Sequence, residues 1–262
     1  MRALRLSCKI ILVGDADQLP SVSAGNVFGD LLASECFESI RLKKVFRQSS
    51  QSMIVTNAHA IINGEKADLS KKNSDFFFLK RYSVIDTCNT VLELCTDRLP
   101  QAYGYNPLTD IQVLCPSKKF DSGTFNLNNL LQSCLNPKRK DTAQLNYKGI
   151  YYRMGDKVMQ IKNNYDIEWK KDNGETGTGI YNGDIGYITD IDIKGGFLNV
   201  RFDDKTVMYF AEDINELELA YAVTVHKSQG SEYPAVVIPL MAGPRMTSLP
   251  LNRASLPIPV PY

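Results

Sequence analysis

Long hydrophobic runs are missing from this sequence, and no apolar stretch approaches the roughly 20 residues that a membrane-spanning helix needs. The six cysteines include no Cys-x-x-Cys pair and there are only two histidines, which argues against a zinc site. The opening Met1-Arg2-Ala3-Leu4 does not begin a signal peptide. Hydrophobic residues make up 44% of the 262 positions, enough for one large core or two modest ones. We expect a soluble cytoplasmic protein that makes no membrane contact.

An excess of charge of one sign is also missing, because the formal net charge is +1. This balance does not exclude a nucleic-acid partner, since a binding groove needs only local positive potential. Lys118 and Lys119 directly follow the strand-like run 111–115. Gly123 and the amphipathic segment after it predict a helix whose amino end could accept a phosphate. A solvated charged surface is the alternative. Between 117 and 140 the only acid is Asp121, against five basic residues, Lys118, Lys119, Lys138, Arg139 and Lys140.

The most informative stretch is YAVTVHKSQGSEY, residues 221–233. A strand-like run from Leu217 to Val225 ends at this polar cluster, and a second apolar run begins at Ala235. An α/β protein often places a ligand site at the carboxyl edge of its sheet by this arrangement, in which a polar turn follows one strand and leads to the next. Gly230 adds backbone freedom, and the cluster supplies hydroxyls, a cation and a carboxylate, which suit phosphate and ribose binding. A plain surface turn is the alternative.

A second informative stretch lies near the amino terminus. The apolar run CKIILV at 8–13 predicts a buried strand, and we expect Cys8, like Cys95 and Cys115, to be a reduced core thiol. Gln18 follows in a tight segment and should project from the carboxyl end of that strand. A glutamine in such a place can orient an attacking water or sense a γ-phosphate. An ordinary turn at the end of a strand is the alternative.

Several motifs occur together in one order, and the series resembles the RecD-like branch of the superfamily 1 DNA helicases, which includes exodeoxyribonuclease V alpha subunits. The resemblance covers about residues 8 to 240. Its motifs are GDADQLPSVSAGNVFGDLL at 14–32, VFRQS at 45–49, PSKKFDSGTFNLNNLLQSCLNP at 116–137, GDKVMQIKNNYD at 155–166, YNGDIGYI at 181–188 and AVTVHKSQGSEYPAVVIPL at 222–240.

The resemblance implies a nucleotide site for ATP and Mg²⁺. Arg47 matches the arginine that reaches the γ-phosphate, and a guanidinium is a permanently charged fork suited to phosphoryl transfer. Gln18 matches the residue that couples the γ-phosphate to the DNA path. Gly230 and Glu232 match the motif that closes on the nucleotide, with Glu232 at the ribose hydroxyls. For Arg47, a salt bridge beside a helix is the structural alternative.

The resemblance also implies a path for single-stranded DNA. Thr224 and His226 match residues that hold the phosphates of the strand, and Ser117, Lys118 and Asn128 are weaker candidates for the same role. Binding through phosphates is largely independent of sequence and strongly sensitive to salt. The family implies translocation from 5′ to 3′, and further partners among recombination nuclease subunits, in DNA repair or recombination.

One family motif is missing. The Walker A string G-x-x-x-x-G-K-[ST], which holds the ATP phosphates, occurs nowhere in the chain. We therefore expect the chain to be the carboxyl-terminal half of such a helicase, to need an amino-terminal motor lobe as its partner, and to hydrolyse no ATP alone. The carboxyl end also departs from the family, since five of the 12 prolines lie within 244–262. Arg253 is not assigned a role, because the prolines around it forbid the expected helix.

The fold class that these patterns and the resemblance predict is α/β, with a RecA-like P-loop NTPase lobe. Helical spacing predicts helices around 26–33, at 50–63 and at about 83–98, alternating with strands at 76–80 and 111–115, which argues for a mostly parallel sheet. The expected domains are the end of a first RecA-like domain at 1–48, a second RecA-like domain at 49–146 and 214–242, an inserted SH3-like β-barrel at 147–213 and a Pro-rich tail at 243–262.

The inserted region has the texture of a small antiparallel barrel, with short apolar runs separated by Gly, Asn and Asp. Trp169 and Tyr165 have two open roles, packing or stacking on bases. Gly174, Gly177 and Gly179 predict a mobile hairpin or loop, and Gly195-Gly196 predicts a tight turn. The expected strands are 151–154, 157–162, 184–193, 197–202 and 206–210.

Two functions remain open from the sequence. The first is a fragment of an ATP-dependent 5′ to 3′ DNA helicase that translocates on single-stranded DNA, supplying one wall of the ATP cleft and part of the DNA path. The second is a non-catalytic remnant of such a helicase, with a role in binding single-stranded DNA or in regulation.

Overall fold

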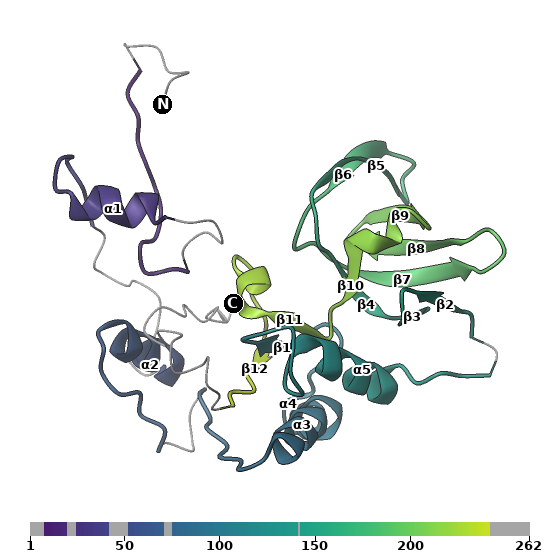
Figure 1. The fold of residues 1–262 in the computed structure, drawn as a ribbon, viewed down its shortest axis with the longest axis horizontal. Helices are drawn as coiled ribbons and strands as arrows, with labels where there is room; N and C mark the ends of the chain where they lie inside the picture. The colour runs from purple at the N-terminus through teal and green to yellow at the C-terminus, as the bar shows by residue number, and fades with distance from the viewer. Residues whose placement is uncertain (1–7, 20–24, 42–51, 71–74, 141, 242–262) are drawn as a thin grey trace. The chain divides into compact units, whose positions relative to one another are not determined.

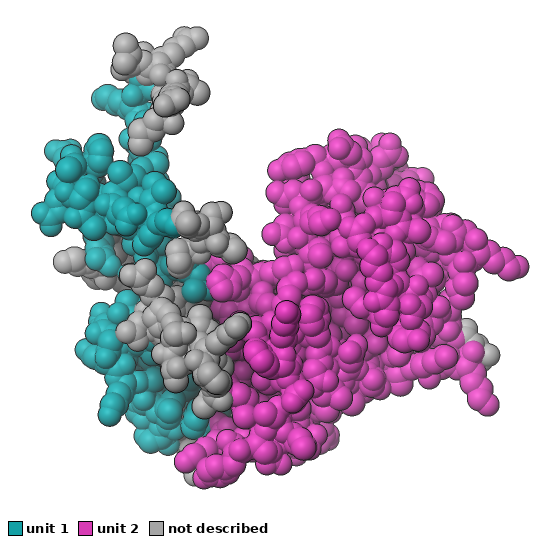
Figure 2. Space-filling view, viewed as in Figure 1, with its two compact units in different colours: residues 1–78, 247–256 teal, residues 79–246, 257–262 magenta. Residues whose placement is uncertain are grey.

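The computed structural model describes residues 8–19, 25–41, 52–70, 75–140 and 142–241. Two compact units share the chain: residues 1–78 with 247–256, and residues 79–246 with 257–262 (Figure 2). Within the described part of the chain, no helix is both long enough and apolar enough to cross a bilayer.

Two capped helices form the regular structure described in the first unit. Helix α1, Val27–Ala33, begins where the Asn26 side chain accepts a hydrogen bond from the Gly29 amide at 3.3 Å. Helix α2, Met53–Ile62, begins in the same way at Ser52. Side-chain acceptors at these positions satisfy amides that the first helical turn leaves unpaired. Both helices are confirmed where the sequence predicted them.

The two strands predicted at 8–13 and 76–80 are wrong. Neither segment pairs with a described strand, and the side chains of Ile11 and Val13 are 85% and 92% exposed. Cys8 is exposed rather than buried. A parallel-sheet strand is buried only when strands and helices cover it, and apolar composition supplies none of these neighbours.

A three-stranded parallel sheet forms the centre of one part of the second unit. Strand β1, Ile111–Cys115, lies between β11, Ala222–Thr224, and β12, Ala235–Val237, and runs parallel to both (Figure 1). All five residues of β1 are buried. Helix α5, Thr124–Leu135, packs against β11 and against α3, Val84–Glu93. The predicted strand at 111–115 and the predicted parallel arrangement are confirmed.

The helical segment predicted at about 83–98 is confirmed and continues further. Helix α3 passes into a π-helical turn, η1, Leu94–Arg98, and then into α4, Leu99–Tyr103. Gly104 ends it with a φ of 72°, the left-handed conformation that glycine adopts at little cost. Cys95 and Cys115 are buried, as the sequence predicted. Burial raises the pKa of each thiol to about 12, so both stay protonated.

A seven-stranded antiparallel sheet forms the other part of the second unit (Figure 1). Its strand order is β10-β4-β7-β8-β9-β5-β6, and a separate hairpin joins β2, Gln144–Tyr147, to β3, Ile150–Arg153. Every strand predicted between 147 and 213 is present. The strands of the sheet are β4, Lys157–Gln160, β5, Asn164–Lys171, β6, Thr176–Ile180, β7, Ile185–Asp192, β8, Phe197–Phe202, β9, Lys205–Phe210, and β10, Leu217–Leu219.

The glycine-rich segment at 174–179 lies in a hairpin, in the turn after β5 and in β6, so the hairpin of the predicted hairpin or loop is confirmed. Strands β5 and β6 pair with Trp169 opposite Gly177. A Cβ added at Gly177 would lie 2.4 Å from the Trp169 ring, so the glycine makes room for the indole. The ammonium groups of Lys171 and Lys205 lie 5.5 and 4.9 Å from that ring. These contacts give Trp169 a packing role, whereas Tyr165 is 63% exposed.

Hydrogen bonds between polar side chains connect the antiparallel sheet to the part of the unit that holds the parallel sheet. The carboxylate of Asp156 accepts hydrogen bonds from Gln132 and Asn136 of α5 and from the hydroxyl of Tyr221, at 2.6 to 2.8 Å. The ammonium of Lys157 on β4 donates to Gln112 on β1 at 2.9 Å. Because all of these residues except the half-buried Asn136 are fully or almost fully buried, their donors and acceptors need partners within the protein.

The last strand of the antiparallel sheet, β10, is followed closely in the chain by β11 of the parallel sheet. Leu219 is the last residue of β10, which pairs with β4, and Ala222 is the first residue of β11, which pairs with β1. The parallel sheet therefore resumes at Ala222. This short connection places Glu218 close to the loop that follows β11.

Candidate functional site

The candidate site lies where two neighbouring strands end. In the parallel pair of β1 and β11, Cys115 is aligned with Thr224. The chain after β1 carries Ser117 and Lys118, and the chain after β11 carries His226 and Lys227. Carboxyl ends of adjacent parallel strands meet at one sheet edge, which is where open α/β sheets bind ligands. The prediction of a polar cluster at such an edge is confirmed for this part of the site.

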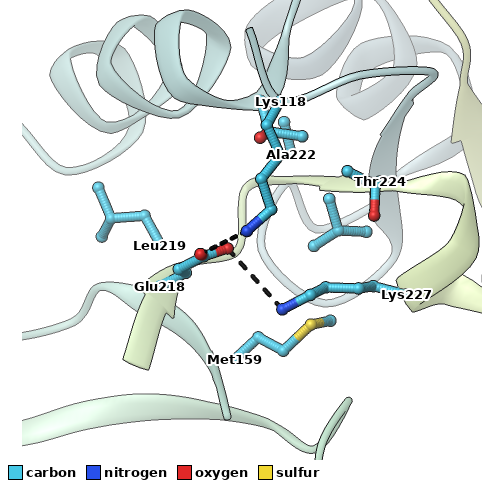
Figure 3. A pocket seen from close by; sticks show the side chains of 9 residues that line it. Lys118, Met159, Glu218, Leu219, Ala222, Thr224 and Lys227 are labelled. Atoms are coloured by element: carbon cyan, nitrogen blue, oxygen red, sulfur yellow. Dashed lines mark hydrogen bonds and ion pairs between the residues drawn. The ribbon is translucent and has the colours of Figure 1, made fainter. Parts of the chain in front are cut away.

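A small pocket lies at this edge (Figure 3). Its volume is about 10 Å³, room for about one water molecule. Met159 from the antiparallel sheet is part of its apolar wall. Both sheets therefore contribute to it. The polar side chains that line it are Lys118, Thr124, Glu218, Thr224 and Lys227.

Two lysines converge on one carboxylate in this pocket. Lys118 Nζ lies 2.6 Å from Glu218 Oε1, and Lys227 Nζ lies 3.8 Å from Glu218 Oε2. Their side chains are 37%, 24% and 19% exposed for Lys118, Glu218 and Lys227. Burial lowers the pKa of Lys227, and Lys118 adds to that effect while Glu218 opposes it. Two cations around one anion leave a net positive site, which favours a further anionic ligand.

The start of α5 is not a free phosphate site, and that prediction is wrong. The amides of Thr124 and Phe125 donate to the carbonyls of Ser117 and Lys118, each at 3.2 Å. Amides already paired in this way are unavailable to an anion. A Cβ at Gly123 would lie 2.2 Å from the Lys119 carbonyl oxygen, so glycine permits this tight turn. The Ser117 hydroxyl donates to the Lys119 carbonyl at 2.9 Å. The turn therefore positions the Lys118 side chain instead.

Asn128 is a structural residue and not a contact for DNA. Its side chain is 7% exposed. The amide nitrogen donates to the carbonyls of Leu219 and Ala222, both at 2.9 Å, and the amide oxygen accepts from the Ala222 amide at 2.8 Å. A buried amide that gives both of its N–H donors to backbone carbonyls has no donor left for a phosphate. Asn128 instead fixes the connection between β10 and β11.

The segment after β11 places polar residues on its exposed side. A short 3₁₀ turn, η3, Val225–Ser228, carries exposed His226, and exposed Gly230 has a φ of 81°. Glu232 is also exposed. Inside the same segment, the hydroxyls of Ser228 and Tyr233 are buried and have no hydrogen-bond partner among the described residues. Buried hydroxyls of this kind are rare and mark a place where a further partner is expected.

The four residues predicted to meet at one triphosphate belong to two different units or lie outside the described residues. Gln18 is exposed in the first unit, where its side-chain nitrogen donates to Asp15 at 3.3 Å. Gly230 and Glu232 belong to the second unit. Arg47 lies outside the described residues, as does Arg253. Their convergence stays a prediction.

Two charged residues of the pocket, Glu218 and Lys227, have no role in the predictions from the sequence. Lys227 stands inside the HKSQG cluster, so its place beside His226 was a usable signal. Glu218 is a single carboxylate in a strand-like run, and nothing in the sequence relates it to Lys118, 100 residues away in the chain. Only the fold brings the two together.

A metal site is not evident in the residues that the structure describes. They contain no group of three or more His, Cys, Asp or Glu side chains arranged to hold an ion. The resemblance places the Mg²⁺ ligands mostly in the amino-terminal motor lobe and not in these residues.

Three family models match successive parts of the chain. A model described as the ATP-dependent RecD-like DNA helicase SH3 domain matches residues 127–202. A model of the UvrD-like helicase C-terminal domain matches 219–252, and a model of the AAA domain matches 1–81. The first covers most of the antiparallel sheet, and the second covers the segment after β10.

Curated relatives align with nearly all of the chain. The ATP-dependent RecD2 DNA helicase of Deinococcus radiodurans is 30% identical over 239 residues, which are 90% of this chain and 29% of the relative. The RecBCD enzyme subunit RecD of Mycobacterium tuberculosis is 27% identical over 252 residues, 90% of this chain and 40% of the relative. The chain thus spans less than half the length of these proteins. A crystal structure of Pif1 helicase from Bacteroides with ADP-AlF3 and ssDNA aligns with a TM-score of 0.46 at 17% identity, covering 92% of this chain and 58% of that one.

Proposed function

Because the chain belongs to the RecD-like family of DNA helicases, we propose that it works as part of an ATP-dependent helicase that translocates 5′ to 3′ on single-stranded DNA. It contributes one wall of the ATP cleft and part of the DNA path. The observation that carries this proposal is the meeting of Lys118, Thr224 and Lys227 at the carboxyl edge of β1 and β11.

The strand is held through its phosphates in this proposal. Lys118 and Lys227 supply positive charge, and the hydroxyl of Thr224 supplies a donor at the same edge. His226 and Ser117 stand on the two loops that leave this edge. His226 adds a donor for a neighbouring phosphate, and Ser117 adds one when its hydroxyl exchanges the Lys119 carbonyl for a phosphate oxygen. Contacts of this kind fix the strand without reading its sequence.

The nucleotide roles belong to residues on both units. Gln18 couples the γ-phosphate to the DNA path, and Arg47 stabilises the charge that develops on that phosphate. Gly230 and Glu232 close on the nucleotide, with Glu232 at the ribose hydroxyls. The exposed positions of Gly230 and Glu232, on a segment with two unpartnered buried hydroxyls, support this assignment. ATP with Mg²⁺ supplies the energy for movement of the motor lobes.

The domain assignment follows the same proposal. Residues 1–48 end a first RecA-like motor domain, and 49–146 with 214–242 form the second. The SH3-like barrel at 147–213 is inserted into the second domain, and 243–262 form a Pro-rich tail. The partners are single-stranded DNA, an amino-terminal motor lobe and recombination nuclease subunits, in the cytoplasm.

A second candidate is a non-catalytic unit that binds single-stranded DNA. The observation in its favour is that the 262 residues contain no Walker A string. The two candidates differ in ATP hydrolysis by the purified chain, which we expect to be undetectable with or without DNA. Robust DNA-stimulated turnover by a pure sample would contradict this expectation.

Salt-dependent binding of a fluorescent oligothymidylate tests the site. If Lys118 neutralises one phosphate, Lys118→Ala weakens binding and reduces the slope of log K against log salt by about 0.7. Lys194→Ala, at the turn between β7 and β8, removes an equal charge away from the pocket and should change little. Equal losses in the two variants would mean that binding depends on overall charge and not on this site.

A further inference from the structure

We infer that Glu218 is an internal substitute for a strand phosphate: it holds Lys118 and Lys227 in place when no strand is bound and yields this position to a phosphate when one enters. This inference rests on the proposed function of the pocket. It assigns to Glu218 control over the affinity of the site.

The geometry of the two ion pairs supports the substitution. Each carboxylate oxygen of Glu218 faces a different ammonium group, at 2.6 Å for Lys118 and 3.8 Å for Lys227 (Figure 3). A phosphodiester has the same formal charge as a carboxylate, and it likewise presents two acceptor oxygens and no donor. A phosphate in place of the carboxylate would therefore satisfy the same two lysines.

The size of the pocket requires Glu218 to move. With its side chain in place, the pocket has room for about one water molecule, which is less than a phosphate group needs. The side chain is 24% exposed and Lys118 is 37% exposed, so solvent screens the pair. Partial screening weakens the Lys118 pair and favours its replacement by another anion, while Lys227 is more buried, at 19% exposed.

The neighbouring acid shows what a purely structural carboxylate looks like in this region. Glu216 accepts hydrogen bonds from Gln160 and Asn164, at 2.9 and 3.0 Å, within the antiparallel sheet. Glu218 lies two residues further on and faces the two lysines at the sheet edge instead. Glu218 thus belongs with the residues that face the pocket, and Glu216 with those that hold the sheet together.

Binding of a fluorescent oligothymidylate to the whole chain tests the inference. We expect Glu218→Gln to bind about threefold more tightly than the wild type at the same salt concentration, because the lysines no longer exchange one anion for another. Glu212→Gln removes the same charge at an exposed position outside the pocket and controls for overall charge. It should leave the affinity within experimental error of the wild type.

Two further variants keep the test decisive. In a Lys118→Ala background, Glu218→Gln should increase the affinity for the oligothymidylate only slightly. One of the two lysines that the substitution frees from Glu218 is then absent. Glu218→Asp keeps the charge but shortens the side chain, so it should bind with an affinity between those of wild type and Glu218→Gln. If Glu218→Gln does not fold, as judged by circular dichroism, the aspartate variant decides the question.

Two simpler ligands identify the source of the phosphate. A base-free phosphodiester oligomer should reproduce the gain of Glu218→Gln, since the bases take no part in it. Inorganic tripolyphosphate represents a nucleotide, and a gain with it alone would overturn the assignment to the strand.

The outcomes separate this inference from the proposed function. A wild type that binds with the expected salt dependence, together with a Glu218→Gln variant that binds equally or more weakly, overturns the role of Glu218 alone. A wild type that binds neither oligomer overturns the proposed function of the pocket, and the role of Glu218 with it.

Discussion

Two apolar segments of this chain have similar composition and opposite surroundings. CKIILV at 8–13 lies exposed and unpaired with any described strand, whereas IQVLC at 111–115 is β1, buried along its whole length. Strand β1 has a parallel neighbour on each side, and α5 and α3 contribute Leu127, Leu131 and Val91 to its core. The comparison shows that composition gives a segment the ability to be buried, while its neighbours decide whether it is.

The largest expected effect comes from truncating a leucine in each segment. Leu114 on β1 is fully buried, so Leu114→Ala should lower the free energy of unfolding by about 3 kcal/mol, through lost burial and the cavity that remains. Leu12 is 57% exposed, and Leu12→Ala should cost less than about 0.5 kcal/mol. Urea unfolding followed by circular dichroism measures both. Equal effects would show that the exposed segment is buried in solution.

A buried charge next to β1 gives the next effect, through pH. Burial lowers the pKa of Lys157 to about 8, although Cys95 and Asp110 oppose this, and the unfolded lysine keeps a pKa of 10.5. Between these values the unfolded chain binds more protons than the folded one, so the contribution of Lys157 to stability rises with pH. From about pH 8 to pH 10 this rise should be about 2 kcal/mol.

A methionine variant isolates that contribution. The raised thiol pKa of Cys95 and Cys115 has the opposite effect on stability at high pH, because the unfolded thiols ionise first. Lys157→Met keeps these thiols and removes the ammonium. The stability of the wild type relative to Lys157→Met should therefore increase from about pH 8 to pH 10, and a constant difference would contradict a lowered pKa for Lys157.

Loss of a buried hydrogen bond at Asp156, between the two sheets, is expected to have an intermediate effect on stability. Asp156→Asn replaces an acceptor oxygen by a donor that must face the amide donors of Gln132 or Asn136, so a buried hydrogen bond is lost. The cost should be about 2 kcal/mol in urea unfolding. Asp190→Asn makes the same chemical change at an exposed position and should cost less than about 0.5 kcal/mol. A small effect at Asp156 would mean that its hydrogen bonds contribute little to holding the antiparallel sheet.

How much the sequence predicts depends on whether the information is local. The alternation in FLNVRF gives β8, and Ser52 with Gly64 bounds α2, because caps and periodicity act over a few residues. Strand β5, NYDIEWKK, is missed, since it is polar and a bulge between Asn164 and Glu168 breaks its alternation. The failures at 8–13 and 76–80 have the other cause, the lack of described neighbours.

The same distinction between local and non-local information applies to the candidate site. Thr224 ends a strand, and Lys118 and His226 follow strands, so their place at a sheet edge could be predicted from order along the chain. Glu218 could not, because its role comes from contacts with Lys118 and Lys227 that the passage from β10 to β11 creates. Asn128 was given the wrong role because a polar residue on a helix near the site has no local sign of being buried against backbone.

The smallest expected effect concerns a strand that glycine makes possible. Gly177→Ala places a methyl group 2.4 Å from the ring of Trp169, and the indole must move away from the β6 strand. The cost should be about 1 kcal/mol, the lower end for an overpacked core, because this ring is only partly buried. Trp169 is the only tryptophan of the chain, so its fluorescence reports the shift directly.

A neighbouring position on the same strand controls for the effect of placing alanine in β6. Thr178→Ala changes an exposed side chain next to Gly177, and it should alter neither the emission maximum nor the stability by a measurable amount. If Gly177→Ala behaves like this control, Trp169 does not pack over Gly177 in solution. Its indole, with Lys171 and Lys205 beside it, would then be open to a stacking partner, and the packing role assigned to it would be wrong.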